Sequence, residues 1–193
     1  MSFLILGLVL FLGVHSVRIF AGDWREAQIA RLGEVRWKGV YSLLSAIGLG
    51  LIIWGYGMAR ADSPTLWGSP IWTRHLAATL TLPAFILLVA AYLPGSRIKA
   101  VVGHPMVAGV KLWALAHLLA NGALVDATLF GAFLIWAVLD FVSARRRDRV
   151  AGRTYPARGA SRDAAVVVIG LIAWALFAFY GHAWLIGVAP FGS

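Results

Sequence analysis

The feature that most constrains this chain is a series of six long apolar runs, separated by shorter polar segments. Each run reaches or approaches the roughly 20 apolar residues that an α-helix needs to cross a bilayer. With 61% hydrophobic and only 13% charged residues, the 193-residue chain could not cover its apolar surface in water. We therefore predict an all-α, multi-pass transmembrane bundle of about six helices, forming a single domain over residues 1–193. The runs are Met1–Phe20, Val40–Ala59, His75–Leu93, Pro105–Ala120, Ala123–Val142 and Ala164–Val188.

The basic residues predict how this bundle is oriented. Fifteen of the seventeen Lys and Arg residues lie in or beside the first, third and fifth loops, and only Arg60 and Arg74 flank the second. By the positive-inside rule these three loops face the cytoplasm and both termini face outward. We expect the protein in the inner (cytoplasmic) membrane, with the lipid bilayer as its partner. Because topology accounts for the formal charge of +9, no nucleic-acid partner is expected; no oligomeric state is predicted.

The residue inventory excludes several kinds of chemistry. The chain has no cysteine, which rules out disulfides, thiolate metal sites, cysteine nucleophiles and covalently attached c-type haem. It also contains no nucleophile-elbow, phosphate-loop, dinucleotide-binding or zinc-protease motif. Any cofactor must be held by His, Asp, Glu or backbone groups.

Two histidines in the middle of apolar runs are the main candidates for a functional site. Ionisable residues inside the membrane are costly and are therefore functional candidates. His15 lies three residues before Arg18 on the first run, and His117 lies one turn from both Trp113 and Asn121. A single histidine of this kind is more often a helix–helix hydrogen-bonding residue. Two on separate helices favour axial ligation of a haem through neutral imidazole nitrogens.

Other local signals concern packing as well as function. His104 precedes Pro105 at the expected start of a helix, where it is either a simple cap or a site residue. Asp140 is expected to pair with a nearby arginine. Asn121-Gly122 predicts a tight turn between the fourth and fifth runs. Four glycines of the second run predict close helix packing: Gly48, Gly50, Gly55 and Gly57.

Three stretches resemble the NnrU family of bacterial membrane proteins. They are His15-Ser16-Val17-Arg18, residues 33–45, and the most distinctive, GHPMVAGVKLWALAHLLANG, at residues 103–122. The resemblance covers about residues 1–147 and implies a role linked to nitric oxide or denitrification metabolism.

A wider likeness extends to 15-cis-ζ-carotene isomerases, membrane proteins that hold b-type haem between two histidines. Matched by motif, it implies that His15 and His117 are axial ligands and that His104 lies nearby. On this interpretation Trp113 and Asn121 shape the haem pocket, and Arg18 belongs to the His15 motif. This chain departs from the isomerase pattern because Val17 replaces a glycine and Arg18 comes two residues earlier.

The leading hypothesis is therefore a membrane protein binding haem b and a small gaseous or apolar ligand. One alternative is a haem-dependent cis–trans isomerase of a carotenoid. Another is a cofactor-free membrane scaffold or assembly factor, in which the histidines only pack. The sequence leaves open whether the protein is an enzyme.

Overall fold

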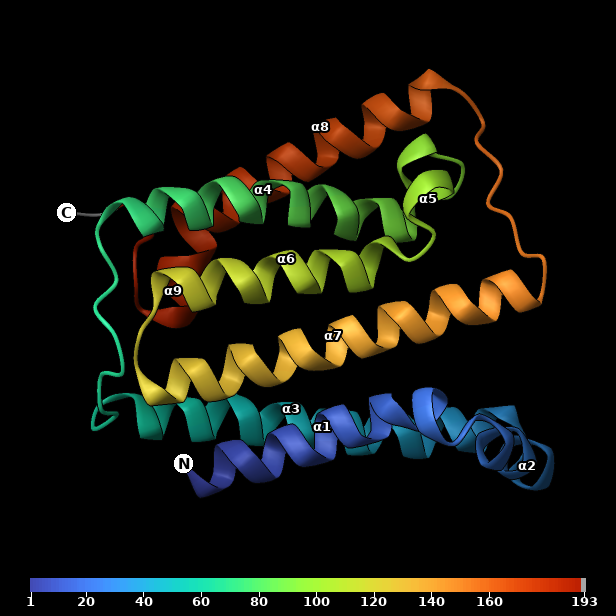
Figure 1. Ribbon diagram of the computed structural model, residues 1–193, viewed down its shortest axis with the longest axis horizontal. Helices are drawn as coiled ribbons and strands as arrows, with labels where there is room; N and C mark the ends of the chain where they lie inside the picture. Colours follow the sequence, from blue (N-terminus) through green and yellow to red (C-terminus); the bar gives the residue numbers. More distant parts are fainter. Residues whose placement is uncertain (192–193) are drawn as a thin grey trace.

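The computed structural model describes residues 1–191 and is all-helical (Figure 1). Apart from one isolated bridge between Thr65 and Ala123, this part of the chain contains no β structure. A π-helical segment, Phe177–Gly181, joins the last two helices. The helices are α1 (Ser2–Phe20), α2 (Gly22–Leu32), α3 (Glu34–Arg60), α4 (Trp72–Tyr92), α5 (Arg97–Val102), α6 (Pro105–Ala120), α7 (Leu124–Val150), α8 (Ala160–Leu176) and α9 (His182–Ile186).

Five helical stretches are long and apolar enough to cross a membrane. They are α1, α3, α4, α7 and the continuous stretch Ala160–Ile186, which contains α8, the π-helical segment and α9. The sixth, α6, has 16 residues and spans about 24 Å, which is shorter than a hydrocarbon core of about 30 Å. The chain is thus a membrane-type helical bundle, and a full crossing by α6 stays a prediction.

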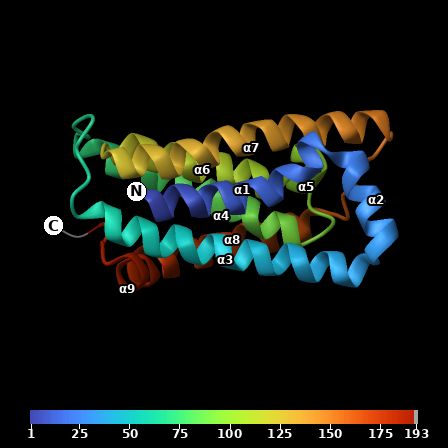
Figure 2. The same cartoon turned by 90° about the horizontal axis from the view of Figure 1, so that it is seen from below.

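The helices are arranged so that α7 connects two groups. On one side α1 packs on α7 and α3 packs on α1; on the other, α6 packs on α7, α4 on α6 and α8 on α4. α1 begins at the end of the bundle where α9 lies, the left end of Figure 1. The opposite end carries α2, α5 and residues 151–159, and is called the basic end below (Figures 1 and 2). That this end faces the cytoplasm stays a prediction.

Two of the four glycines predicted to pack closely, Gly48 and Gly55 on α3, confirm that expectation. A Cβ atom on Gly48 would lie 2.8 Å from the backbone nitrogen of Phe11 on α1, and one on Gly55 would meet the backbone of Leu4. Gly50 and Gly57 face open space instead. α1 and α3 therefore approach each other along one glycine-lined face. Buried side chains from both helices join α7 in a common core: Leu4, Leu8, Ile52, Val125, Leu129 and Phe130.

The predicted turn at Asn121-Gly122 is confirmed, because α6 ends at Ala120 and α7 begins at Leu124. The Gly122 carbonyl accepts the backbone N–H of Leu66 at 2.7 Å and that of Trp67 at 3.3 Å. The turn is thereby tied to the segment between α3 and α4.

Candidate functional site

His15 lies inside a group of aromatic rings on the side of α1 that faces α3 and α7. Its ring stacks on Phe11 with 4.2 Å between centroids. Tyr41 of α3 and Trp136 of α7 follow at 5.1 and 5.9 Å. The indole N–H of Trp136 is buried without a hydrogen-bond partner. The site thus combines the His15 imidazole with the Trp136 indole N–H, a hydrogen-bond donor that has no acceptor.

His117 occupies a second aromatic group on α6. Its ring lies 4.7 Å from that of Phe130 and 5.4 Å from that of Trp113, measured between centroids. His182 of α9 faces it at 6.4 Å, with the two ring planes 20° apart. α6 and α9, which are separated in the sequence by α7 and α8, therefore bring a pair of imidazoles together.

Both predicted ligands, His15 and His117, are held by the same kind of hydrogen bond, from the imidazole to the backbone carbonyl one helical turn earlier. Nδ1 of His15 lies 2.6 Å from the carbonyl oxygen of Phe11, and Nδ1 of His117 lies 2.8 Å from that of Trp113. A carbonyl oxygen only accepts, so the proton is assigned to Nδ1 in each ring. Nε2 then keeps its lone pair, which is the state a metal-binding neutral imidazole needs.

The structure places these two histidines at different depths of the bundle. On α7, His117 contacts Phe130 and His15 contacts Trp136. Those two positions are six residues apart, which corresponds to about 9 Å along the helix. Between them lies Phe133, whose ring contacts both Phe11 and Trp113. His15 and His117 therefore share an aromatic layer without meeting.

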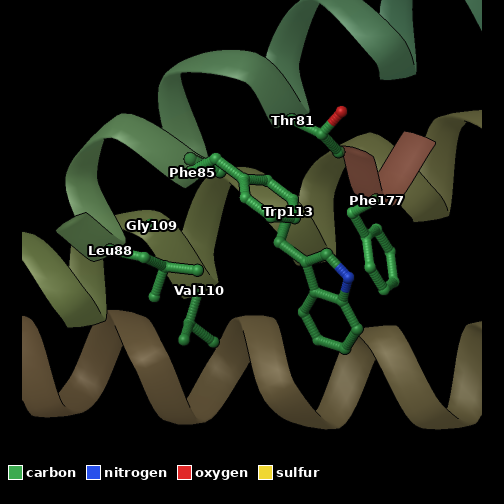
Figure 3. Close-up of a pocket in the computed structure, with 8 residues that line it drawn as sticks. Thr81, Phe85, Leu88, Gly109, Val110, Trp113 and Phe177 are labelled. Atoms are coloured by element: carbon green, nitrogen blue, oxygen red, sulfur yellow. The ribbon is translucent and has the colours of Figure 1, made fainter. Parts of the chain in front are cut away.

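Trp113 also lines an apolar cavity of about 230 Å³ between α4, α6 and the π-helical segment. Figure 3 shows its indole and the Phe177 ring at the same end of the cavity. The one polar side chain in the wall, Thr81, accepts the indole N–H of Trp174 at 3.1 Å. The cavity offers space for part of an apolar molecule. Its lining residues are Thr81, Ala84, Phe85, Leu88, Gly109, Val110, Trp113 and Phe177.

Asn121 contacts His117 through the backbone. Its backbone N–H and its side-chain amide both donate to the His117 carbonyl, each at 2.9 Å. These bonds order the last turn of α6, which carries the histidine.

His104 belongs to a separate cluster at the basic end. Its Nε2 lies 2.8 Å from the buried Asp148 carboxylate, which also accepts the Tyr155 hydroxyl at 3.0 Å. Burial, together with the bond to Asp148, raises the pKa of the Tyr155 phenol above its ordinary value. His104 is thirteen residues before His117 on the α6 side, about 20 Å along the helix. The structure therefore does not bring these two histidines together.

Arg18 also lies near the basic end. Its carbonyl accepts Arg147 at 3.4 Å, and both arginines line a second cavity together with Arg146. Asp140 pairs with Arg147 at 3.8 Å, as expected. The last residue of the His15–Arg18 motif therefore lies beside Arg146 and Arg147.

Three residues that contact the candidate histidines were not predicted from the sequence: His182, Asp148 and Tyr155. His182 faces His117, and its Nδ1 lies 2.6 Å from the Val188 carbonyl, six residues later in the chain rather than one helical turn earlier as at His15 and His117. The π-helical segment before it is a feature often found at functional sites, but it has no sequence signature. Within residues 1–191, no group of three or more His, Asp or Glu side chains is arranged to hold a metal ion.

Comparison with known proteins places the chain in a family. The family model described as NnrU protein matches residues 3–190, nearly the whole length. No curated protein and no solved structure matches the chain. Because the family match spans far more than half of the sequence, the chain belongs to the NnrU protein family.

Proposed function

We propose that this NnrU-family membrane protein binds haem b inside the bilayer, with His15 and His117 as axial ligands. The observation that carries the proposal is the shared anchoring of the two imidazoles. Each Nδ1 bonds the carbonyl one turn earlier, at 2.6 Å for His15 and 2.8 Å for His117, which leaves Nε2 free. Such fixed tautomers are typical of metal-binding histidines.

The side chains around His15 and His117 have the chemistry to bind haem. The two histidines, however, lie too far apart in this structure to hold one iron together. Both sites are aromatic, and the unpartnered Trp136 N–H beside His15 is a donor available to a bound group. One iron could be held by both histidines only if each Nε2 came within a metal–nitrogen bond of about 2 Å of it. The positions that the two histidines contact on α7 are about 9 Å apart along that helix, so joint ligation would require α1 and α6 to move relative to each other.

The link to nitric oxide or denitrification rests on the family. Bound haem would supply a redox-active iron, and a diatomic ligand would bind that iron in place of one of the two histidines. The apolar surroundings of His117 would admit such an uncharged gas and exclude ions.

The experiment is haem quantification on detergent-purified protein supplied with haem, followed by nitric oxide addition to the ferrous form. The proposal expects about one non-covalent haem b per chain and a Soret shift with nitric oxide. Haem without a nitric oxide response would remove the gas ligand and keep the haem site. A protein that takes up no haem would leave the cofactor-free scaffold or assembly factor as its function.

A second candidate, a haem-dependent polyene isomerase, is favoured by one observation. The apolar cavity adjoins Trp113, whose ring contacts His117. At about 230 Å³ it is smaller than the usual 300–1,000 Å³ of small-molecule sites, so it would hold only part of a carotenoid. Incubation with 15-cis-ζ-carotene in liposomes under reducing conditions tests this activity, and no conversion by haem-loaded protein would exclude it.

A further inference from the structure

The arginine cavity at the basic end is independent of haem and points to a different ligand. This cavity, of about 340 Å³, lies where the end of α1 and the start of α2 meet the last turns of α7. Its walls combine three arginines with one hydroxyl and two apolar side chains. They are Arg18, Arg146, Arg147, Ser143, Ile19 and Val150.

The convergence of the arginines is a property of the fold. The positive-inside rule requires basic residues on one side of the membrane, but it does not require them to share a cavity. Arg147 reaches across from α7 to the Arg18 carbonyl of α1, 129 positions earlier in the chain. The packing of α1 on α7 therefore assembles the cluster.

The geometry leaves most of the positive charge uncompensated. Arg147 is held by Ser143, whose Oγ accepts Nη1 at 2.7 Å, and by Asp140, 3.8 Å from Nη2. Among residues 1–191, neither Arg18 nor Arg146 forms an ion pair. One carboxylate thus stands against three guanidinium groups, and an anion would balance the rest.

The chemistry of the walls selects a phosphate group. Guanidinium groups present paired N–H donors that match phosphate oxygens, and they are the preferred residues for binding it. Basic pockets between transmembrane helices on the cytoplasmic side are typical sites for anionic lipid headgroups. Ile19 and the exposed Val150 supply an apolar rim that an acyl chain could follow.

We propose that the Arg18–Arg146–Arg147 cavity binds a phosphate group, that of an anionic phospholipid in the adjoining leaflet. The site would fix the packing of α1 against α7 at the basic end. Neither haem nor nitric oxide is needed for this binding.

The test is native mass spectrometry of the full chain in detergent, titrated with phosphatidylglycerol and, separately, with phosphatidylcholine. Affinity for the first bound phosphatidylglycerol is compared with that of the double variant Arg18→Gln/Arg146→Gln. Each lost arginine is expected to weaken binding about fivefold, so the double variant should bind about 25-fold more weakly. The matched control is Arg149→Gln/Arg162→Gln, which removes the same charge from exposed positions outside the cavity; its affinity should change less than about twofold.

Two further arms complete the design. Inorganic phosphate is added as competitor, with chloride at equal ionic strength as control. Displacement by low-millimolar phosphate alone would assign the same site to a soluble phosphate compound, whereas resistance to it assigns the site to the lipid. If the double variant unfolds, Arg146→Gln alone carries the test and should weaken binding about fivefold. Equal losses in the cavity and control variants, or equal binding of phosphatidylcholine, would overturn the site.

Discussion

At the scale of single residues, the Asp148 side chain joins two segments that lie far apart in the sequence. It is buried, accepts the Tyr155 hydroxyl at 3.0 Å, and lies 2.8 Å from His104 Nε2. These bonds tie the start of α6 and the segment after α7 to one point. Hydrogen bonds to a charged acceptor contribute more than those between neutral groups.

Asp148→Asn is therefore expected to lower the free energy of unfolding by about 1–3 kcal/mol, because a neutral amide replaces the charged acceptor of both bonds. Thermal unfolding in detergent measures the change. The control is Asp62→Asn, in an exposed position between α3 and α4, which should unfold like the unmodified protein. Equal melting temperatures for the Asp148 and Asp62 variants would show that the cluster does not stabilise the bundle.

Local spacing predicted some residue contacts and could not predict others. Trp113 and His117 were placed on one helical face, and the His117 Nδ1 contact with the Trp113 carbonyl follows that i−4 spacing. The partners of His104 are Asp148, 44 residues further along the chain, and Tyr155, 51 residues further along, whose ring lies 6.0 Å from the imidazole. Which helices meet is decided by tertiary packing, and no local pattern encodes it. The same holds for His182, which directly follows a π-helical segment and faces His117.

At the scale of elements, the close packing of α1 on α3 depends on glycines, which have no side chain. Lipid is as apolar as the helices, so close van der Waals packing takes over the role of the hydrophobic effect. Gly48 and Gly55 allow the α1 backbone to approach α3 at two points one heptad apart. Gly50 and Gly57, two residues further along in each case, face away from α1.

Gly48→Ala should destabilise the protein by about 1–3 kcal/mol, because the added Cβ would lie 2.8 Å from the Phe11 nitrogen and α1 must move. Gly50→Ala, with nothing within 4 Å of its Cβ, should be neutral or slightly stabilising. Melting temperatures of the two variants in the same detergent provide the comparison. A Gly50 variant as unstable as the Gly48 variant would contradict the assignment of the packing face.

The apolar runs predicted which elements exist better than where they end. The run expected at Val40–Ala59 lies in a helix that begins at Glu34, and the run at Ala123–Val142 continues as helix to Val150. Hydropathy marks only the part of a helix that lipid must cover. Charged residues such as Glu34 and Lys38, which pair at 2.7 Å, extend the helix beyond it.

At the scale of the whole molecule, the arrangement separates a basic end from the end that holds the start of α1 and α9 (Figure 1). The positive-inside rule assigns the basic end to the cytoplasm. Because the chain lacks cysteine, a single introduced cysteine can report which side of the membrane its position faces, with no labelling of native cysteines.

Ser2→Cys and Gly68→Cys are expected to react with a membrane-impermeant maleimide in intact cells, since both lie at the predicted outer end. Glu26→Cys in α2 and Ala157→Cys before α8 should react only after the membrane is opened. The extent of labelling on gels measures each. The reverse pattern would invert the topology, and mixed labelling within one pair would change the number of crossings.

Whether His15 and His117 together hold a haem can be read from the optical spectra of histidine variants. We would record oxidised and dithionite-reduced spectra of purified protein beside His15→Ala, His117→Ala and the control His75→Ala, an exposed histidine on α4. Ligation by both histidines should give sharp reduced α and β bands in the unmodified protein and in the control, and these bands should be lost in both site variants. Bands that persist in both site variants, or a protein that stays colourless after haem is supplied, would contradict it.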